Sequence, residues 1–152
     1  MKAGELCTRR VVTADPDEPI TVCALRMEEY GVGDLIVVER SGETVRPIGI
    51  VTDRDLAIRG LGHGGPHPAR VTARDVMTSN MRVVRDSDDV DTALATLKRH
   101  AIRRIPVVGA AGELQGVLSL DDVLAWIGEQ MRDVTTLIDR QTAAVGRPAD
   151  RA

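Results

Sequence analysis

Short apolar runs and helical spacings alternate along the chain in an order that occurs twice. In the first copy, an apolar run at residues 10–13 precedes an acidic turn and apolar positions spaced three and four apart over residues 20–30. That spacing is typical of an amphipathic helix. Two further apolar runs, at residues 35–38 and 48–51, are joined by a segment that contains Gly and predict a β-hairpin. A closing helix is expected after Thr52, a residue suited to the N-cap.

The second copy follows the first at a fixed distance over most of its length. Ile20 aligns with Val90 and Leu35 with Ile105, each 70 positions further on, and residues 49–56 return as residues 116–123. The corresponding strands are expected at residues 82–84, 105–108 and 116–118, and the helices at 90–97 and after Ser119. The repeated unit is therefore predicted to be β-α-β-β-α, in an α/β fold whose two copies bury each other's apolar faces.

These copies divide the chain into a first unit at residues 4–60 and a second at residues 73–129. Residues 61–72 between them contain several Gly and Pro residues, a composition typical of a flexible connector.

The closing helix of the second copy is predicted to continue beyond the repeat, over residues 130–145. Its apolar positions alternate steps of four and three residues, the spacing of a heptad seam, and comprise Leu120, Leu124, Ile127, Met131, Val134 and Ile138. A stripe of this kind without a partner would face water. We therefore expect a homodimer that buries Ile127, Met131, Val134 and Ile138, and a disordered tail at residues 146–152.

Composition excludes several classes of function. A net charge of −3 gives no electrostatic basis for binding nucleic acid or an anionic membrane. No run approaches the ~20 apolar residues that span a bilayer, and the N-terminus lacks the apolar core of a signal peptide. Cys7 and Cys23 do not have metal-ligand spacing, so a cytoplasmic protein with reduced thiols and no metal site is expected. No nucleophile with an activating base is apparent, so we do not expect an enzyme.

Two motifs frame each copy. The copies open with Leu6-Cys7-Thr8 or Val76-Met77-Thr78, and each closes with Gly-x-x-Thr/Ser-x-x-Asp. This combination resembles the CBS (cystathionine-β-synthase) domain, and two in tandem resemble a CBS pair, or Bateman module, over about residues 4–129. The resemblance implies pseudo-twofold packing with clefts between the units. It also implies binding there of an adenosine compound such as AMP, ADP, ATP, S-adenosylmethionine or NAD. Such pairs usually regulate an attached enzyme or channel; none is attached here, so a stand-alone member is expected.

The closing motif places a hydroxyl and a carboxylate at a helix N-terminus in each copy. Thr52 would lie where free N–H groups attract a phosphate, and Asp55 one turn on could accept hydrogen bonds from two ribose hydroxyls. Ser119 and Asp122 repeat the arrangement. The alternative is purely structural, with the hydroxyls as N-caps and the carboxylates stabilising the helix dipole.

Basic residues distinguish the two copies. Arg103 and Arg104 precede a strand in the second copy, where the resemblance implies contact with a ligand phosphate, and an arginine fork suits phosphate oxygens. The alternative is a solvated pair at a helix end, where cations offset the helix dipole. Their equivalents in the first copy are Gly33 and Asp34. We therefore expect the phosphorylated ligand beside Thr52, Asp55 and Arg103 or Arg104, with Arg54 either solvated or turned towards phosphate. The Ser119 cleft, facing Asp34, is expected to be weak or empty.

The resemblance further implies that aliphatic side chains and backbone hold adenine. The residues concerned are Val12, Thr13, Leu35 and Ile36 for one cleft, and Val83, Val84, Ile105 and Pro106 for the other. For each of them, packing in the core is the alternative role.

The function predicted from the sequence is a sensor that binds an adenosine nucleotide and signals to an unidentified partner. The nucleotide would be a regulatory ligand, and no cofactor is required. The alternative is a scaffold that binds proteins without any ligand.

Overall fold

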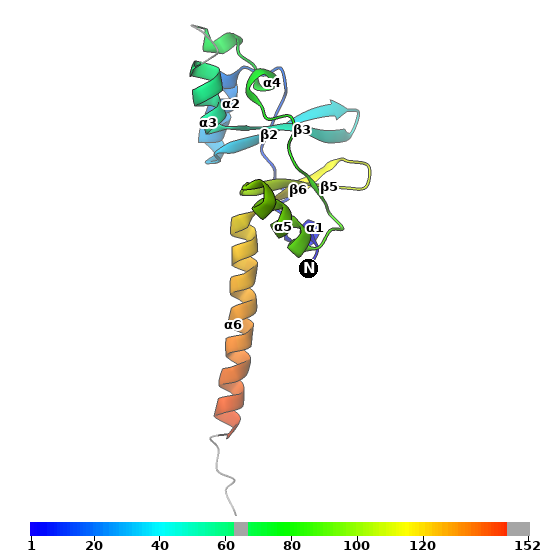
Figure 1. The fold of residues 1–152 in the computed structure, drawn as a ribbon, viewed down its shortest axis with the longest axis vertical. Coiled ribbons are helices and arrows are strands. Elements are labelled where there is room, and N and C mark those ends of the chain that lie inside the picture. Colours follow the sequence, from blue (N-terminus) through cyan, green and yellow to red (C-terminus); the bar gives the residue numbers. More distant parts are fainter. Residues whose placement is uncertain (63–66, 146–152) are drawn as a thin grey trace, which may run out of the picture.

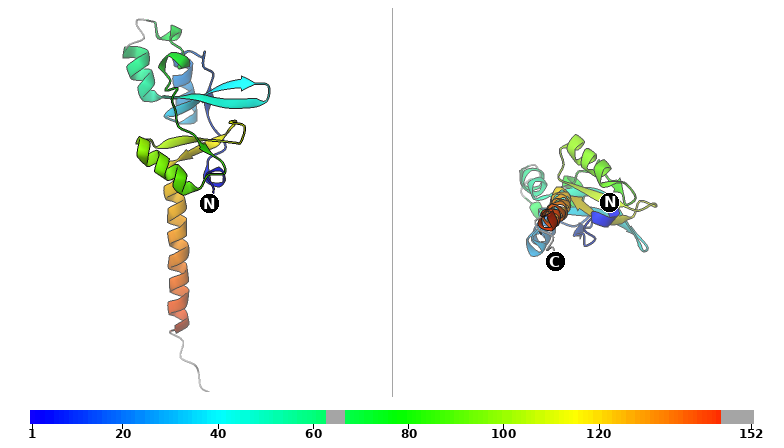
Figure 2. Two further views of the ribbon diagram at one scale, coloured as in Figure 1. Left: turned by 45° about the vertical axis from the view of Figure 1, so that its right-hand side comes forward. Right: turned by 90° about the horizontal axis from the view of Figure 1, so that it is seen from below.

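The chain forms two stacked α/β units, with one long helix extending from the second (Figures 1 and 2). The computed structural model describes residues 1–62 and 67–145. The first unit comprises β1 (Thr13–Ala14), α2 (Ile20–Tyr30), β2 (Asp34–Ser41), β3 (Thr44–Thr52), α3 (Asp53–Asp55) and the π-helical η1 (Leu56–Gly62). The second comprises β4 (Val84–Arg85), α5 (Val90–His100), β5 (Arg104–Val108), β6 (Leu114–Ser119) and α6 (Leu120–Val145). The predicted α/β fold with two repeats is confirmed.

Each unit contains one mixed three-stranded sheet. The central strand pairs in parallel with the short first strand and antiparallel with the third, in the order β1-β2-β3 and β4-β5-β6. The two hairpins are therefore confirmed, and a register shift occurs at the same place in both, after Val37 and after Val107. The first strands are shorter and later than predicted, because pairing begins only at Thr13 and at Val84.

Two short helices that the apolar pattern did not predict open the repeats, and each packs on the other unit. From α1 (Ala3–Leu6), the Ala3 amide donates to the carbonyl of Asp88 at 2.8 Å. Next to α1, Thr8 and Val117 exchange backbone hydrogen bonds of 2.9 and 3.0 Å. The N-terminus of the chain is thus part of the second unit.

The reciprocal contact is made by α4 (Ala73–Val76), which follows the 3₁₀ turn η2 (Pro68–Arg70). The Ala73 amide donates to the carbonyl of Glu18 at 2.8 Å, and Thr78 exchanges backbone hydrogen bonds of 2.9 and 3.1 Å with Ile50. The units at residues 4–60 and 73–129 are therefore contiguous in sequence but exchange their first segments in space. Neither apolar core is complete without the other copy.

Two aliphatic cores result from this exchange. In the second unit, Ala3 and Cys7 are buried with Leu118 and Val123. In the first, Ala73 and Val76 are buried with Leu35 and Val51. Because both cores draw residues from both copies, we expect the two units to unfold together.

The closing helices differ in length and in type. The first begins directly after Thr52, as predicted, but continues after Asp55 as a π-helix that ends at Gly62. The second, α6, runs for 26 residues and confirms the predicted extension. Part of the predicted connector is helical, in η1 and η2. Residues 63–66 of the connector and the predicted disordered tail at 146–152 lie outside the described residues.

Within residues 1–62 and 67–145, no helix combines the length and the apolar character needed to cross a membrane.

Candidate functional site

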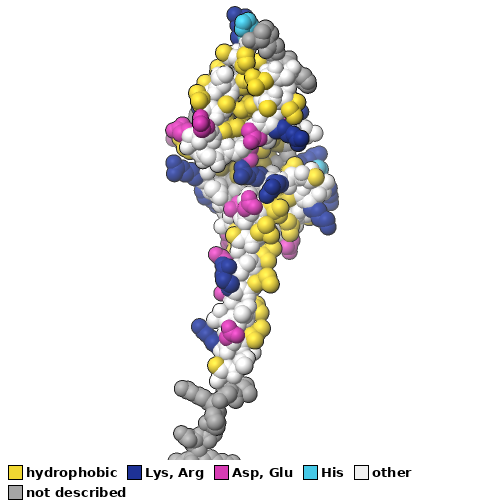
Figure 3. Space-filling model, turned by 90° about the vertical axis from the view of Figure 1, so that its left-hand side faces the viewer, with side chains coloured by type: hydrophobic (Ala, Val, Ile, Leu, Met, Phe, Trp, Pro, Cys, Tyr) yellow, Lys and Arg dark blue, Asp and Glu magenta, His cyan; other side chains and the backbone are white. Residues whose placement is uncertain are grey.

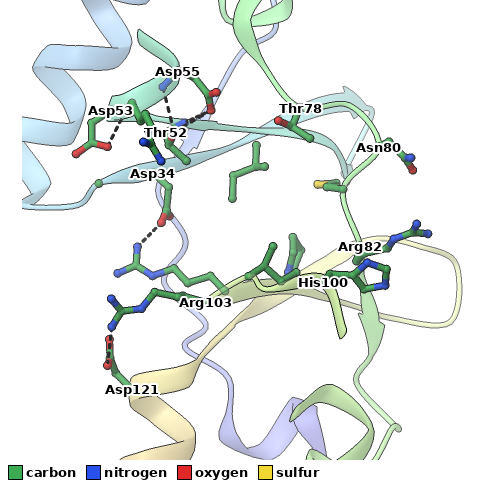
Figure 4. A pocket seen from close by; sticks show the side chains of 17 residues that line it. Asp34, Thr52, Asp53, Asp55, Thr78, Asn80, Arg82, His100, Arg103 and Asp121 are labelled. Atoms are coloured by element: carbon green, nitrogen blue, oxygen red, sulfur yellow. Dashed lines mark hydrogen bonds and ion pairs between the residues drawn. The ribbon is translucent and has the colours of Figure 1, made fainter. Parts of the chain in front are cut away.

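A cleft of about 830 Å³ lies between the two units and is lined by both (Figure 4). Its volume is in the range that small-molecule sites occupy in proteins. The first unit supplies Gly33, Asp34, Ile50, Thr52, Asp53, Arg54 and Asp55, and the remaining wall consists of Thr78, Asn80, Met81, Arg82, His100, Ile102, Arg103, Arg104, Pro106 and Asp121. The structure therefore brings together the five residues expected around a ligand phosphate and ribose: Thr52, Arg54, Asp55, Arg103 and Arg104.

Thr52 and Asp55 form a reciprocal cap at the start of α3. One carboxylate oxygen of Asp55, Oδ2, accepts hydrogen bonds from the Thr52 amide at 3.0 Å and the Thr52 hydroxyl at 2.8 Å. In return, the Asp55 amide donates to the Thr52 hydroxyl oxygen at 3.1 Å. The second oxygen, Oδ1, lies 3.7 Å from the guanidinium of Arg59. The structural role of this motif is thus fulfilled, while Oδ1 keeps the capacity to accept hydrogen bonds from a ligand.

Similar N-terminal caps occur twice more, at Ser119 and at Thr72. Asp122 accepts from the Ser119 amide at 2.8 Å and the Ser119 hydroxyl at 2.6 Å. Asp75 accepts from the amide and hydroxyl of Thr72, at 2.8 and 2.9 Å, on a surface outside both clefts. These hydrogen bonds, the backbone one foremost, lower the pKa of Asp75. The Thr/Ser-x-x-Asp pattern alone therefore marks a helix start and does not by itself identify a ligand site.

Arginine side chains line the opposite wall of the cleft. The Nη1 group of Arg104 donates to the Oδ2 atom of Asp34, and this ion pair joins the two units. Arg103 is more exposed and lies 3.8 Å from Asp121. Arg82 and His100 also line the cleft (Figure 4), although the sequence analysis did not select them. Both are separated in sequence from the closing motifs, so only the fold places them here.

A second, smaller cleft of about 190 Å³ surrounds Ser119 and Asp122. Asp34, which was expected to face this cleft, lines it together with Arg104, and both residues also line the larger cleft. Arg10, which the sequence analysis did not select, adds a second cation. The difference in volume favours ligand binding beside Thr52, and that asymmetry stays a prediction.

The residues expected to hold adenine separate into two groups. Val12 and Ile36 line the smaller cleft and Pro106 lines the larger one. Leu35 and Ile105 are fully buried in the two cores. Successive side chains of a strand point to opposite faces, so Leu35 faces its own core while Ile36 faces the space between the units.

The three remaining residues of that set line neither cleft. Val84 is buried in the core of the second unit, and Val83 is exposed. Thr13 lies on the outer side of the first unit, where its carbonyl accepts a hydrogen bond from Arg26 at 2.7 Å. Leu35, Val84 and Ile105 thus take the alternative role, packing in the core, and the apolar wall of the larger cleft instead includes Ile50 and Ile102.

Comparison with known proteins points to one family. The family model of the CBS domain matches residues 3–61 and 73–129. An uncharacterised protein of Methanopyrus kandleri is 35% identical over 124 residues, which cover 82% of this chain and 61% of that protein. The chain therefore spans about three fifths of the length of this relative.

Two solved structures of CBS proteins with bound AMP share the fold. The protein from Pyrobaculum aerophilum has a TM-score of 0.69 and 30% identity, with 80% of this chain and 89% of that chain covered. The protein named CBSX2 has a TM-score of 0.70 and 27% identity, with 86% and 98% covered.

Proposed function

The chain belongs to the CBS domain family, with two copies in tandem. We propose that it is a regulatory module that binds an adenosine nucleotide in the larger cleft, beside Thr52. One observation carries the proposal. A cleft of about 830 Å³ places the Thr52–Asp55 cap of one unit opposite Arg103 and Arg104 of the other. A helix start, a carboxylate and two guanidinium groups are the partners that a ribose phosphate needs.

The cleft offers each part of a nucleotide a different wall. Asp55 Oδ1 is the acceptor for ribose hydroxyls, because Oδ2 already accepts from Thr52. Arg103 and Arg104 are the donors for phosphate. Ile50, Ile102 and Pro106 provide apolar surface for adenine. AMP, ADP and ATP all fit this division, and the AMP bound to the two structural relatives supports AMP as the first ligand to test.

Signalling follows from the position of the cleft between two units that share their cores. A ligand that contacts both units stabilises one relative packing over others, and so shifts the population of conformations that a partner protein meets. No covalent step is involved. We place the protein in the cytoplasm, where the free thiols of Cys7 and Cys23 remain reduced.

Calorimetric titration with AMP, ADP, ATP and S-adenosylmethionine tests the proposal, and three matched variants locate the site. Asp55→Ala, Asp122→Ala and Asp75→Ala each remove the carboxylate of one N-terminal cap, so each should cost a similar ~1 kcal/mol of folding stability. Only Asp55→Ala removes a carboxylate from the larger cleft. We expect micromolar binding that is lost in Asp55→Ala, is little changed in Asp122→Ala and is unchanged in Asp75→Ala.

Equal losses in all three variants would assign the effect to folding. Binding lost only in Asp122→Ala would place the ligand in the smaller cleft. Absence of heat with every nucleotide would favour the alternative function, a scaffold that binds proteins without a ligand. The exposed apolar stripe of α6 is the feature that favours this alternative.

We further propose that α6 pairs with α6 of a second copy of the chain. Its stripe, defined by Leu124, Ile127, Met131, Val134 and Ile138, is exposed in the single chain (Figure 3). The helix positions beside the stripe are uncharged and comprise Gly128, Gln130, Thr135, Leu137 and Thr142. The charged residues of α6 after Gly128 lie on its other faces. Two identical helices therefore bring no like charges together along this seam, which favours a second copy as the partner.

A further inference from the structure

The ion pair between Asp34 and Arg104 joins equivalent positions of the two repeats. Each residue begins the central strand of its sheet, Asp34 in β2 and Arg104 in β5, and they are 70 positions apart. Two residues related by the internal period touch each other only where the pseudo-twofold axis passes. The pair therefore lies close to the pseudo-twofold axis between the units, and Figure 4 shows Asp34 pointing from the first unit towards the second.

Both members of the pair are accessible to a ligand from either side. Asp34 and Arg104 line the larger and the smaller cleft alike, and their side chains are 20% and 37% exposed. This partial burial strengthens the attraction relative to a pair on the open surface. To contact a ligand phosphate, Arg104 must therefore either share its guanidinium between the phosphate and Asp34 or break its contact with Asp34.

The charges of the larger cleft balance as a whole. Four arginines and four aspartates line it, so its formal charges cancel and it has no general excess of positive charge to attract a polyphosphate. Of the arginines selected for phosphate, Arg103 is 3.8 Å from Asp121 and largely exposed, whereas Arg104 donates directly to Asp34. Asp34 is therefore the anion in closest competition with a ligand.

We propose that Asp34 is a built-in competitor for Arg104, which sets how tightly the larger cleft binds a ligand phosphate and limits its affinity for highly charged ligands. The inference rests on the proposed nucleotide site. A phosphate that binds Arg104 shares or replaces a charge-assisted hydrogen bond that the protein already makes. Neutralising Asp34 removes that competition and strengthens binding, the opposite of what loss of a ligand contact does.

The dependence on ligand charge distinguishes competition from a structural effect. Adenosine carries no phosphate and leaves the ion pair intact, so its affinity should not depend on Asp34. AMP should gain from Asp34→Asn, and ATP, with more negative charge, should gain more. A variant that merely loosened the packing of the units would weaken all three ligands together.

The test is a double-mutant cycle with Asp34→Asn, Arg104→Gln and the combined variant, each titrated with adenosine, AMP and ATP at about 0.15 M salt, where the Debye length is about 8 Å. Asp34→Asn should tighten AMP binding about tenfold, the worth of one charge-assisted hydrogen bond. Arg104→Gln should weaken it by a similar factor. In the Arg104→Gln background, Asp34→Asn should have a much smaller effect. Asp34→Ser is a second neutral replacement, and thermal unfolding checks that each variant is folded.

Asp121→Asn is the matched control, because Asp121 also faces an arginine that lines the cleft, Arg103, but makes a longer, more exposed contact. It should tighten AMP binding less than Asp34→Asn does. Suppose that the wild type binds AMP but Asp34→Asn does not bind it more tightly, or that Asp34→Asn tightens binding equally in the Arg104→Gln background. Either result would contradict the proposed competition and leave the nucleotide site in place. If neither the wild type nor Asp34→Asn binds any nucleotide, both proposals fail. Binding that appears only in Asp34→Asn supports both.

Discussion

The two units share one scaffold but present different charges to the space between them. Both contain the same three-stranded sheet, the same register shift and the same capped helix start. At the start of the central strand, however, the first unit has Gly33 and Asp34 where the second has Arg103 and Arg104. Near the pseudo-twofold axis, this difference produces a complementary ion pair instead of a contact between like residues. A duplicated fold thereby contains two clefts of unequal size without any change of topology.

The closing helices show the same contrast at a larger scale. The first unit ends in a π-helical segment at Gly62, whereas α6 continues to Val145 and carries an exposed apolar stripe on one side (Figure 3). The first unit thus ends within the paired fold, while the second leaves an apolar surface exposed in the single chain. The predictions below test these differences between the units.

The largest effect is expected from removing what only the second unit has, the apolar stripe of α6. Met131→Glu combined with Val134→Glu places four like charges at the seam of a dimer, so the molar mass from light scattering should fall to that of the monomer. Thr136→Glu, on the opposite face of the same helix, is the control and should leave the dimer intact. A wild-type protein that is monomeric at micromolar concentration would contradict the proposed dimer.

A second test compares equivalent glycines of the third strands. A Cβ on Gly116 would lie 2.5 Å from the Sγ atom of Cys7 and 2.8 Å from the carbonyl oxygen of Thr8. A Cβ on Gly49 would meet the Sδ atom of Met77 at 2.5 Å, but its nearest backbone atom is 3.2 Å away. The long Met77 side chain can move, whereas the short buried Cys7 and the backbone at Thr8 cannot.

Gly116→Ala should therefore lower the free energy of unfolding by about 3 kcal/mol and Gly49→Ala by about 1 kcal/mol, within the range for overpacked sites. Urea unfolding measures both. Because the two cores share segments, each variant should still unfold in one transition. Equal losses of unfolding free energy would mean that the two exchanged segments yield equally to the added methyl group. Two separate unfolding transitions would contradict the interdependence of the units.

The smallest effect concerns the two thiols. Burial raises the pKa of both Cys7 and Cys23, which lowers the thiolate fraction at neutral pH. Cys7 is 8% exposed next to the short α1, whereas Cys23 is fully buried in α2. Labelling with a thiol reagent should modify Cys7 several times faster, because a segment near a terminus opens more often. Cys7→Ser and Cys23→Ser assign the two rates, and labelling in denaturant should equalise them.

Much of the site could be predicted from local sequence. The Thr52 and Ser119 caps and the two arginines at the start of β5 are recognisable because a motif of a few residues determines each. The same pattern also occurs at Thr72 and Asp75, which lie outside both clefts. Leu35 and Ile105 were expected beside adenine but are buried in the cores. Two neighbouring strand residues face opposite sides, and an unbroken apolar run does not show which of them faces the cleft.

By itself, the sequence determined the two repeats, their hairpins, their capped helix starts and the continuation of α6. These features depend on the spacing of apolar residues and on contacts within a few positions of the chain. Only the tertiary structure decided that α1 and α4 exchange units, that Arg82 and His100 line the larger cleft, and that Asp34 meets Arg104. Each of these joins segments far apart in sequence, and their proximity depends on how the two sheets stack, which no local pattern encodes.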